Sequence, residues 1–131
     1  MLDHTGINVS DLARSKAFYR AALAPLRYEI RKEHGAAAAG FGVPDGPGKS
    51  PDPAGDFWIA QGDPQTPRIH IAFTAASRAE VDAFYRAALA AGGKDNGPPG
   101  IRPQYHAGYY AAFVLDPDGY NIEAVCHNAA G

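Results

Sequence analysis

The chain has 131 residues, 46% of them hydrophobic and 20% charged, with a formal net charge of −2, and this suits one compact domain over residues 1–131. No block of Lys or Arg is present, which argues against nucleic acid as a partner, and no apolar stretch approaches the roughly 18 residues that indicate a membrane span. A single cysteine, Cys126, excludes an intrachain disulfide, and the first residues lack a basic region leading into an apolar run, so we expect a cytoplasmic protein.

The first half of the chain predicts a strand, a helix and further strands. Residues 2–9 alternate so that His4 faces away from the isoleucine and the valine of the same segment, as side chains do along a strand. A capping serine or aspartate then starts a helix at about Leu12, which ends around Pro25. The segments that follow are a strand at 28–31, an ambiguous alanine-rich stretch at 37–43, a loop rich in proline and glycine at 44–55, and a strand at 56–60.

The second half predicts a similar order. Residues 68–74 alternate in period two, and His70 faces away from the isoleucines and the phenylalanine. Ser77 and Glu80 have capping-box spacing, an apolar stripe at helical spacing follows, and two glycines at 92–93 stop the helix. The other predicted segments are a linker at 64–67, a loop at 96–103, strands at 109–115 and 120–125, and a hairpin turn at 116–119.

The two halves are related by an internal repeat. The sequence FYRAAL at 18–23 recurs at 84–89, an offset that also places His4 on His70. Self-similarity of this kind indicates duplicated structural units. We therefore predict two homologous βαβββ modules, one over about 1–63 and the other over about 68–127.

The repeat also brings forward a candidate metal site. His4 and His70 stand at equivalent strand positions, and Glu123 lies in the last predicted strand. A carboxylate that points inward needs a partner, because burying it unpaired is costly. Two imidazoles and one carboxylate suit a divalent metal with open positions. The alternative is structural: histidines that are partly exposed or hydrogen-bonded, and a glutamate on a solvated sheet face.

These residues resemble those of the vicinal oxygen chelate superfamily, which includes glyoxalase I, bleomycin-resistance proteins, fosfomycin-modifying enzymes and extradiol dioxygenases. The resemblance spans the chain and rests on LDHTGINVSD at 2–11, FY at 18–19, HIAF at 70–73 and AFVLDPDGYNIE at 112–123. It implies an α+β fold in which two paired βαβββ modules form a curved mixed sheet around a metal cavity, with the helices outside. It also implies that His4, His70 and Glu123 are the metal ligands.

The sequence departs from part of that family in the last strand of the first module. Glyoxalase I and methylmalonyl-CoA epimerase carry a fourth protein ligand there. Here Phe57, Trp58 or Ile59 falls opposite Glu123, depending on the alignment, and only Asp56 at the strand's start could bind a metal. The resemblance therefore points to the dioxygenase and fosfomycin branches rather than to glyoxalase I activity.

Polar aromatic residues precede the next-to-last strand, and part of this segment should overhang the cavity. Tyr105 and His106 are candidates for acid–base groups or supporting donors, and Arg102 for binding a carboxylate or phosphate. Trp58 and Tyr110 are candidates for substrate contacts. Packing explains Trp58 equally well, and one of the two tyrosines at 109–110 should be core, because neighbours on a strand alternate faces.

The leading functional hypothesis is a metalloenzyme acting on a small oxygen-rich substrate chelated to a divalent metal, by lyase, isomerase or dioxygenase chemistry. Zn²⁺, Fe²⁺, Mn²⁺, Ni²⁺ and Co²⁺ all suit two histidines and a glutamate. The alternative is a non-enzymatic binding or resistance protein that sequesters a small molecule in the cavity. In both cases we expect a homodimer, because the sheet edges need cover.

Overall fold

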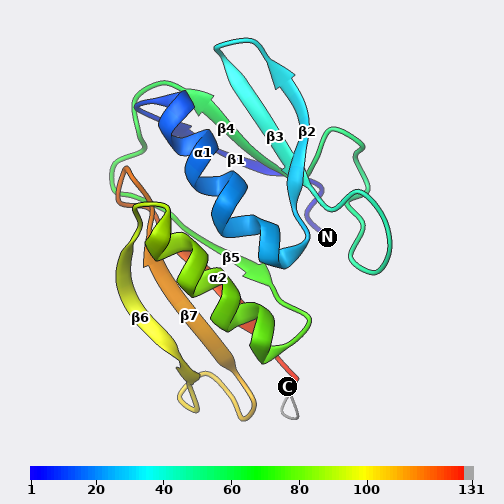
Figure 1. Cartoon of the computed structure of the whole chain (residues 1–131), viewed down its shortest axis with the longest axis vertical. Coiled ribbons are helices and arrows are strands. Elements are labelled where there is room, and N and C mark those ends of the chain that lie inside the picture. The colour runs from blue at the N-terminus through cyan, green and yellow to red at the C-terminus, as the bar shows by residue number, and fades with distance from the viewer. Residues whose placement is uncertain (129–131) are drawn as a thin grey trace.

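The computed structural model describes residues 1–128, which form two modules of the same design (Figure 1). The first contains β1 (Thr5–Val9), α1 (Leu12–Leu23), a short 3₁₀ turn (Ala24–Leu26), β2 (Glu29–His34), β3 (Ala38–Gly42) and β4 (Phe57–Gln61). The second contains β5 (His70–Thr74), α2 (Arg78–Ala90), β6 (Lys94–Ile101), β7 (Tyr110–Leu115) and β8 (Asn121–Cys126). The predicted α+β fold of paired βαβββ modules is confirmed.

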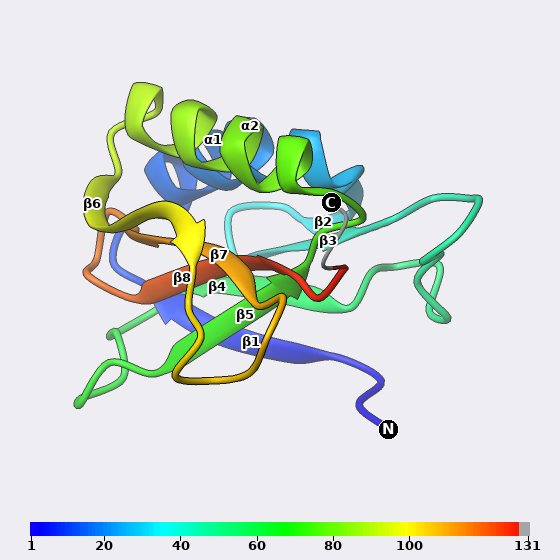
Figure 2. The ribbon, with the colours of Figure 1, turned by 90° about the horizontal axis from the view of Figure 1, so that it is seen from below.

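Each module forms its own four-stranded mixed sheet, in the orders β1-β4-β3-β2 and β5-β8-β7-β6. The first strand of each module pairs in parallel with the last, and the other pairs are antiparallel. Figure 2 shows both helices on the same side of the two sheets. The opposite faces of the sheets are thus free of helices.

The helices begin where side chains satisfy free backbone donors. Asp11 accepts a hydrogen bond from the Arg14 N–H (3.1 Å), which starts α1. Ser77 accepts from the Glu80 N–H (3.2 Å), and Glu80 reaches back to the N–H of Ala76 (2.9 Å). This is nearly the predicted capping box, with the return bond one residue earlier than the cap.

The core lies between the sheets and the helices and joins the two modules. Phe57 of the first module meets Phe73 of the second edge to face at a centroid distance of 5.2 Å, and Tyr19 packs edge to face on the same Phe57 ring at 5.0 Å. Tyr19 is fully buried and its hydroxyl donates to Asp116 in the turn before β8. The modules therefore share one hydrophobic core, and their relative placement is fixed by packing as well as by polar contacts.

The first strands of the two modules run in opposite directions (Figure 2). At the end of β1, the Asn8 carbonyl accepts from the Tyr120 hydroxyl (2.7 Å), and the Ser10 N–H donates to Asp118 (3.0 Å). The end of β1 thus lies beside the start of β8. Because the two strands run in opposite directions, residues at equivalent positions, such as the first residue of each strand, lie toward opposite ends of the molecule.

Two local predictions differ from the structure, and one stretch that the sequence left ambiguous is a strand. Residues 96–103 were expected as a loop, but β6 extends to Ile101 along the sheet edge, with register shifts around Gly97 and Gly100. Prolines are tolerated there because an edge strand with bulges has backbone positions that need no ladder bond. The ambiguous stretch at 37–43 is strand β3, and the first strand begins at Thr5 rather than at residue 2.

Within the described residues 1–128, the longest and most apolar helices fall short of what a membrane crossing requires.

Candidate metal centre

His70 and Glu123 form a close pair on the helix-free face of the second sheet. His70 opens β5 and Glu123 lies in the middle of β8, where it is opposite Ala72 in the parallel register. The His70 Nε2 atom is 2.8 Å from Glu123 Oε1. The imidazole is 45% exposed while the carboxylate side chain is only 3% exposed, so the pair is open to solvent from the histidine side.

The second ring nitrogen of His70 fixes the chemistry of this contact. Its Nδ1 atom is 2.8 Å from the backbone carbonyl of Asn121, and a carbonyl can only accept, so Nδ1 carries a proton. In the neutral imidazole the Nε2 lone pair then faces the Glu123 carboxylate. A nitrogen lone pair and a carboxylate oxygen repel each other at this distance unless a cation or a proton lies between them. A histidine whose other ring nitrogen donates to a backbone carbonyl is also the usual arrangement of a metal ligand.

Tyr109 completes the surroundings of this carboxylate. Its hydroxyl donates a hydrogen bond to Glu123 Oε2, the oxygen that His70 does not contact. Partial burial, together with that hydrogen bond, raises the pKa of Tyr109 to about 12, so the hydroxyl keeps its proton at neutral pH. Tyr109 was not singled out from the sequence. The observed register explains its position: Tyr109 lies directly before β7, whose Phe113 is opposite Glu123.

Tyr110 points away from this pair. Its hydroxyl donates to Asp82 on α2 (2.7 Å), and the guanidinium carbon of Arg78 lies 5.0 Å from its ring centroid. The hydrogen bond to Asp82 is the main cause that raises the pKa of Tyr110. Its expected role in substrate contact is therefore not supported: alternation along β7 turns it to the helix side and leaves Tyr109 on the face of Glu123.

The segment before β7 lies beside Tyr109. Tyr105, which is 59% exposed, packs edge to face on the Tyr109 ring at 4.9 Å, and His106 packs on the same ring at 5.3 Å. The guanidinium carbon of Arg102 lies 5.4 Å from the centroid of the Phe113 ring, and the guanidinium group donates to the Pro98 carbonyl (2.6 Å). The segment therefore contacts the surroundings of Glu123 through Tyr109.

His4 lies elsewhere. It is the residue before β1, and its Nδ1 atom is 2.7 Å from an Asp3 oxygen, which raises the pKa of its imidazole. Across residues 1–128, the one group of three metal-ligating side chains with ligand atoms all within 4.8 Å is Asp3, His4 and Asp52. A single chain therefore does not gather His4 with His70 and Glu123. The opposite directions of β1 and β5 are the physical reason.

The strand register identifies the residue equivalent to Glu123 in the first module. Glu123 is opposite Ala72, two residues after His70. Two residues after His4 is Gly6, and its partner on β4 is Trp58. Trp58 is therefore the first-module counterpart of Glu123, and its indole stacks on the His34 imidazole, with ring centroids 5.6 Å apart and an interplanar angle of 16°.

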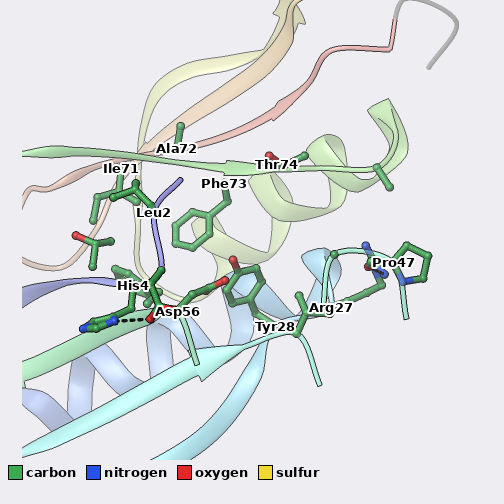
Figure 3. Close-up of a pocket in the computed structure, with 16 residues that line it drawn as sticks. Leu2, His4, Arg27, Tyr28, Pro47, Asp56, Ile71, Ala72, Phe73 and Thr74 are labelled. Atoms are coloured by element: carbon green, nitrogen blue, oxygen red, sulfur yellow. Dashed lines mark hydrogen bonds and ion pairs between the residues drawn. The ribbon is translucent and has the colours of Figure 1, made fainter. Parts of the chain in front are cut away.

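A cavity of about 520 Å³ opens between the start of β1 and β5 (Figure 3). His4 and Asp56 line it together with Tyr28, whose pKa is raised by burial and by the neighbouring Asp56 carboxylate. Asp56 also accepts a hydrogen bond from Ser50 (3.0 Å). Most of the remaining lining is apolar: Leu2, Val43, Pro47, Phe57, Ile71, Ala72, Phe73 and Ala76.

Comparisons with known proteins agree on one family. A sequence profile described as the Glyoxalase/Bleomycin resistance protein/Dioxygenase superfamily matches residues 1–124. The structure is similar to a glyoxalase/bleomycin resistance protein from Albidiferax ferrireducens T118, with 29% identity, TM-score 0.75, and coverage of 96% of this chain and 98% of that chain. A comparison with curated proteins gives no match.

Two more distant structures share the fold. A lactoylglutathione lyase from Agrobacterium tumefaciens has 19% identity and TM-score 0.66, with 96% of this chain and 92% of that chain covered. A mutant of the fosfomycin resistance protein FosX from Listeria monocytogenes, complexed with Mn(II) and 1S,2S-dihydroxypropylphosphonic acid, has 23% identity and TM-score 0.68, with 95% and 88% covered. At these identities the likeness establishes the architecture alone.

Proposed function

Because the chain belongs to the glyoxalase/bleomycin resistance protein/dioxygenase superfamily, we propose that it is a metal-dependent enzyme acting on a small, oxygen-rich substrate. The single observation that carries the proposal is the contact between His70 and Glu123. A buried carboxylate and an imidazole oriented by a backbone carbonyl are 2.8 Å apart, and solvent reaches the pair from the side of the half-exposed imidazole.

The donor set fits a divalent metal ion. His70 Nε2 and Glu123 Oε1 are close enough for one ion to contact both, and nitrogen with oxygen donors suits Zn²⁺, Fe²⁺, Mn²⁺, Ni²⁺ or Co²⁺. A divalent ion held there supplies Lewis-acid stabilisation of negative charge on substrate oxygens. The Mn(II) and vicinal diol in the FosX complex support this use of the fold.

We propose that the third ligand, His4, comes from a second copy of the chain. Within one chain His4 lies with Asp3 and Asp52, apart from the pair in the second module. A two-fold dimer that sets the first module of one copy against the second module of the other would bring His4 to His70 and Glu123 twice, because a two-fold interface repeats every contact. The helix-free sheet faces are the surfaces available for such pairing.

The surrounding residues take supporting roles. Tyr109 orients the Glu123 carboxylate through its hydroxyl, and its protonated state at neutral pH makes it a proton donor toward that oxygen. Tyr105 and His106, proposed as acid–base groups, contact the ring of Tyr109 and therefore lie one residue further from Glu123 than Tyr109 does. Arg102 provides a cation beside Phe113 that can attract an anionic substrate group.

The residue that corresponds to Glu123 in the first module argues against one reaction, that of glyoxalase I. Trp58 cannot bind a metal or accept a proton, so the carboxylate chemistry of glyoxalase I has no counterpart in the first module. Lyase, isomerase or dioxygenase chemistry at a three-ligand site remains, with Trp58 offering an aromatic surface to the substrate.

A second candidate function is sequestration of a small molecule without chemistry. The cavity of about 520 Å³ favours it, since its size and mostly apolar lining match small-molecule sites, and His70 and Glu123 are outside that lining. In this case the ligand would occupy the space between β1 and β5.

Elemental analysis and titration calorimetry separate the two functions. The protein is expressed without added metal, purified in metal-free buffer and titrated with Mn²⁺ or Zn²⁺. The enzyme proposal expects one ion per chain at the His70–Glu123 centre of the wild type. The affinity of that site should fall at least about tenfold in His70→Ala and Glu123→Gln, in line with the 10–100-fold that even outer partners of a ligand contribute. Equal affinity in all three proteins, or none in any, leaves sequestration as the function.

A further inference from the structure

A second pair of imidazoles lies next to Tyr109, on residues that the proposed metal centre does not use as ligands. His106 belongs to the segment before β7, and His127 follows directly after β8. His106 Nε2 is 3.0 Å from His127 Nδ1, and the two rings stack at a centroid distance of 5.1 Å and an angle of 23°. Two nitrogen ligands from separate segments thus converge at the surface.

The backbone determines which nitrogen of His106 is available. Its Nδ1 atom is 2.7 Å from the Ala107 carbonyl, which only accepts, so Nδ1 carries the proton and the lone pair is on Nε2. That is the nitrogen facing His127. Orientation of one ring nitrogen by a carbonyl while the other is free to ligate is the pattern of metal-binding histidines, as it is for His70.

His127 can present its own lone pair to the same point. In the present contact one of the two facing nitrogens donates to the other, which makes His127 Nδ1 the donor. Moving that proton to Nε2 of the same ring leaves a neutral imidazole and frees Nδ1 as a ligand. No net charge changes, so a cation gains two neutral nitrogen ligands without displacing protons into solvent.

Packing on one aromatic ring holds both imidazoles in place. The centroid of the Tyr109 ring is 5.3 Å from that of His106, with an interplanar angle of 79°, and 5.3 Å from that of His127, with an angle of 81°. The Tyr109 hydroxyl is committed to Glu123. The same side chain therefore positions the carboxylate through its oxygen and the histidine pair through its ring, which lowers the ordering cost of binding at the pair.

We propose that His106 and His127 form a second site, distinct from the His70–Glu123 centre, that binds a divalent transition-metal ion. Imidazole selects Ni²⁺, Cu²⁺, Zn²⁺ or Co²⁺ over Mg²⁺ and Ca²⁺, which prefer oxygen. Both side chains are exposed, so ions reach the pair from solvent and water completes the coordination.

The test uses the full chain with the first centre removed. The double variant His70→Ala, Glu123→Gln is titrated with Ni²⁺ by calorimetry, alone and with His106→Ala or His127→Ala added. We expect the double variant to bind one Ni²⁺ and each added substitution to weaken that binding at least about tenfold. Adding His34→Ala, an exposed histidine on β2, is the matched control and should leave Ni²⁺ affinity unchanged.

Two results would overturn the proposal. One is a double variant that binds no Ni²⁺ while far-ultraviolet circular dichroism shows a folded protein. The other is Ni²⁺ binding that persists at the same affinity in both His106→Ala and His127→Ala, or that falls equally in His34→Ala. A Mg²⁺ titration adds a selectivity measure: Mg²⁺ binding as tight as Ni²⁺ binding also contradicts imidazole ligation. Because the first centre is absent from these proteins, its own failure would not affect the outcome.

Discussion

The Tyr109 hydroxyl donates a hydrogen bond to one oxygen of Glu123, while His70 contacts the other oxygen. The Tyr109 hydroxyl thus satisfies one oxygen of a carboxylate that is only 3% exposed, while the other oxygen faces His70 Nε2 and needs a proton or a cation between the two atoms. An ionised carboxylate needs such partners to remain buried, because an unpaired one loses its hydration without compensation. The hydrogen bond from Tyr109, together with a proton or cation shared with His70, explains how Glu123 can be buried on a sheet face.

Tyr109→Phe should destabilise the metal-free protein. The substitution removes the donor to Glu123 Oε2 and leaves a buried carboxyl oxygen without a hydrogen bond, which costs about 1–3 kcal/mol. Urea denaturation in metal-free buffer measures the change in free energy of unfolding. Tyr105→Phe is the control, because Tyr105 is 59% exposed, and it should change stability by less than about 0.5 kcal/mol. Equal effects of the two substitutions would show that the Tyr109 hydroxyl does not stabilise Glu123.

Trp58→Glu should strengthen divalent-metal binding. The strand register places Trp58 where the second module has Glu123, so a carboxylate there adds a ligand beside His4. We expect at least about a tenfold gain in Zn²⁺ affinity, or ~1.4 kcal/mol, by titration calorimetry. Trp58→Phe removes the same indole stacking on His34 without adding a ligand, and should give no gain. If both variants bind Zn²⁺ alike, position 58 does not face the metal.

Asp116→Asn should change how stability depends on pH. Burial raises the pKa of Asp116 above its ordinary value, despite hydrogen bonds from Tyr19 and from two backbone N–H groups. The folded state thus binds this proton more tightly than the unfolded chain, whose value is about 3.9. The stabilisation is complete below that value and is lost as pH rises through the folded pKa.

The asparagine variant lacks this contribution but keeps an oxygen for the two backbone donors. Urea denaturation between about pH 3 and pH 6 should therefore show the wild type gaining stability relative to the variant as pH falls. A constant difference across that range would contradict the raised pKa of Asp116.

Local sequence signals predicted most of the fold. The FYRAAL repeat, the alternation around the two histidines and the DPDG turn each depend on neighbouring residues, so both modules, both helices and strands β7 and β8 follow from them. Strand β6 was missed because its prolines and glycines look like a loop; its strand form depends on the β7 edge beside it. Alanine and glycine gave β3 no clear preference either.

The site was harder to predict because it depends on how the two modules are placed. The repeat identified His4 and His70 as equivalent, but equivalence under a two-fold relation does not mean proximity, and β1 and β5 run in opposite directions. The alignment left three residues open opposite Glu123, and only the observed register selects Trp58. Tyr109 and Tyr110 are neighbours whose faces could not be assigned before the start of β7 was known.

Mixing two defective variants tests most directly whether the metal centre is shared between copies. His4→Ala and Glu123→Gln each remove a ligand of the shared centre, and alone each should bind Zn²⁺ weakly at that centre. If His4 of one copy joins His70 and Glu123 of the other, co-expressed chains form mixed dimers with one intact centre, restoring about a quarter of the wild-type sites under random two-fold pairing. Calorimetry on the co-purified mixture should recover that fraction at wild-type affinity. No recovery, with dimers confirmed by light scattering, would contradict a centre built from two copies.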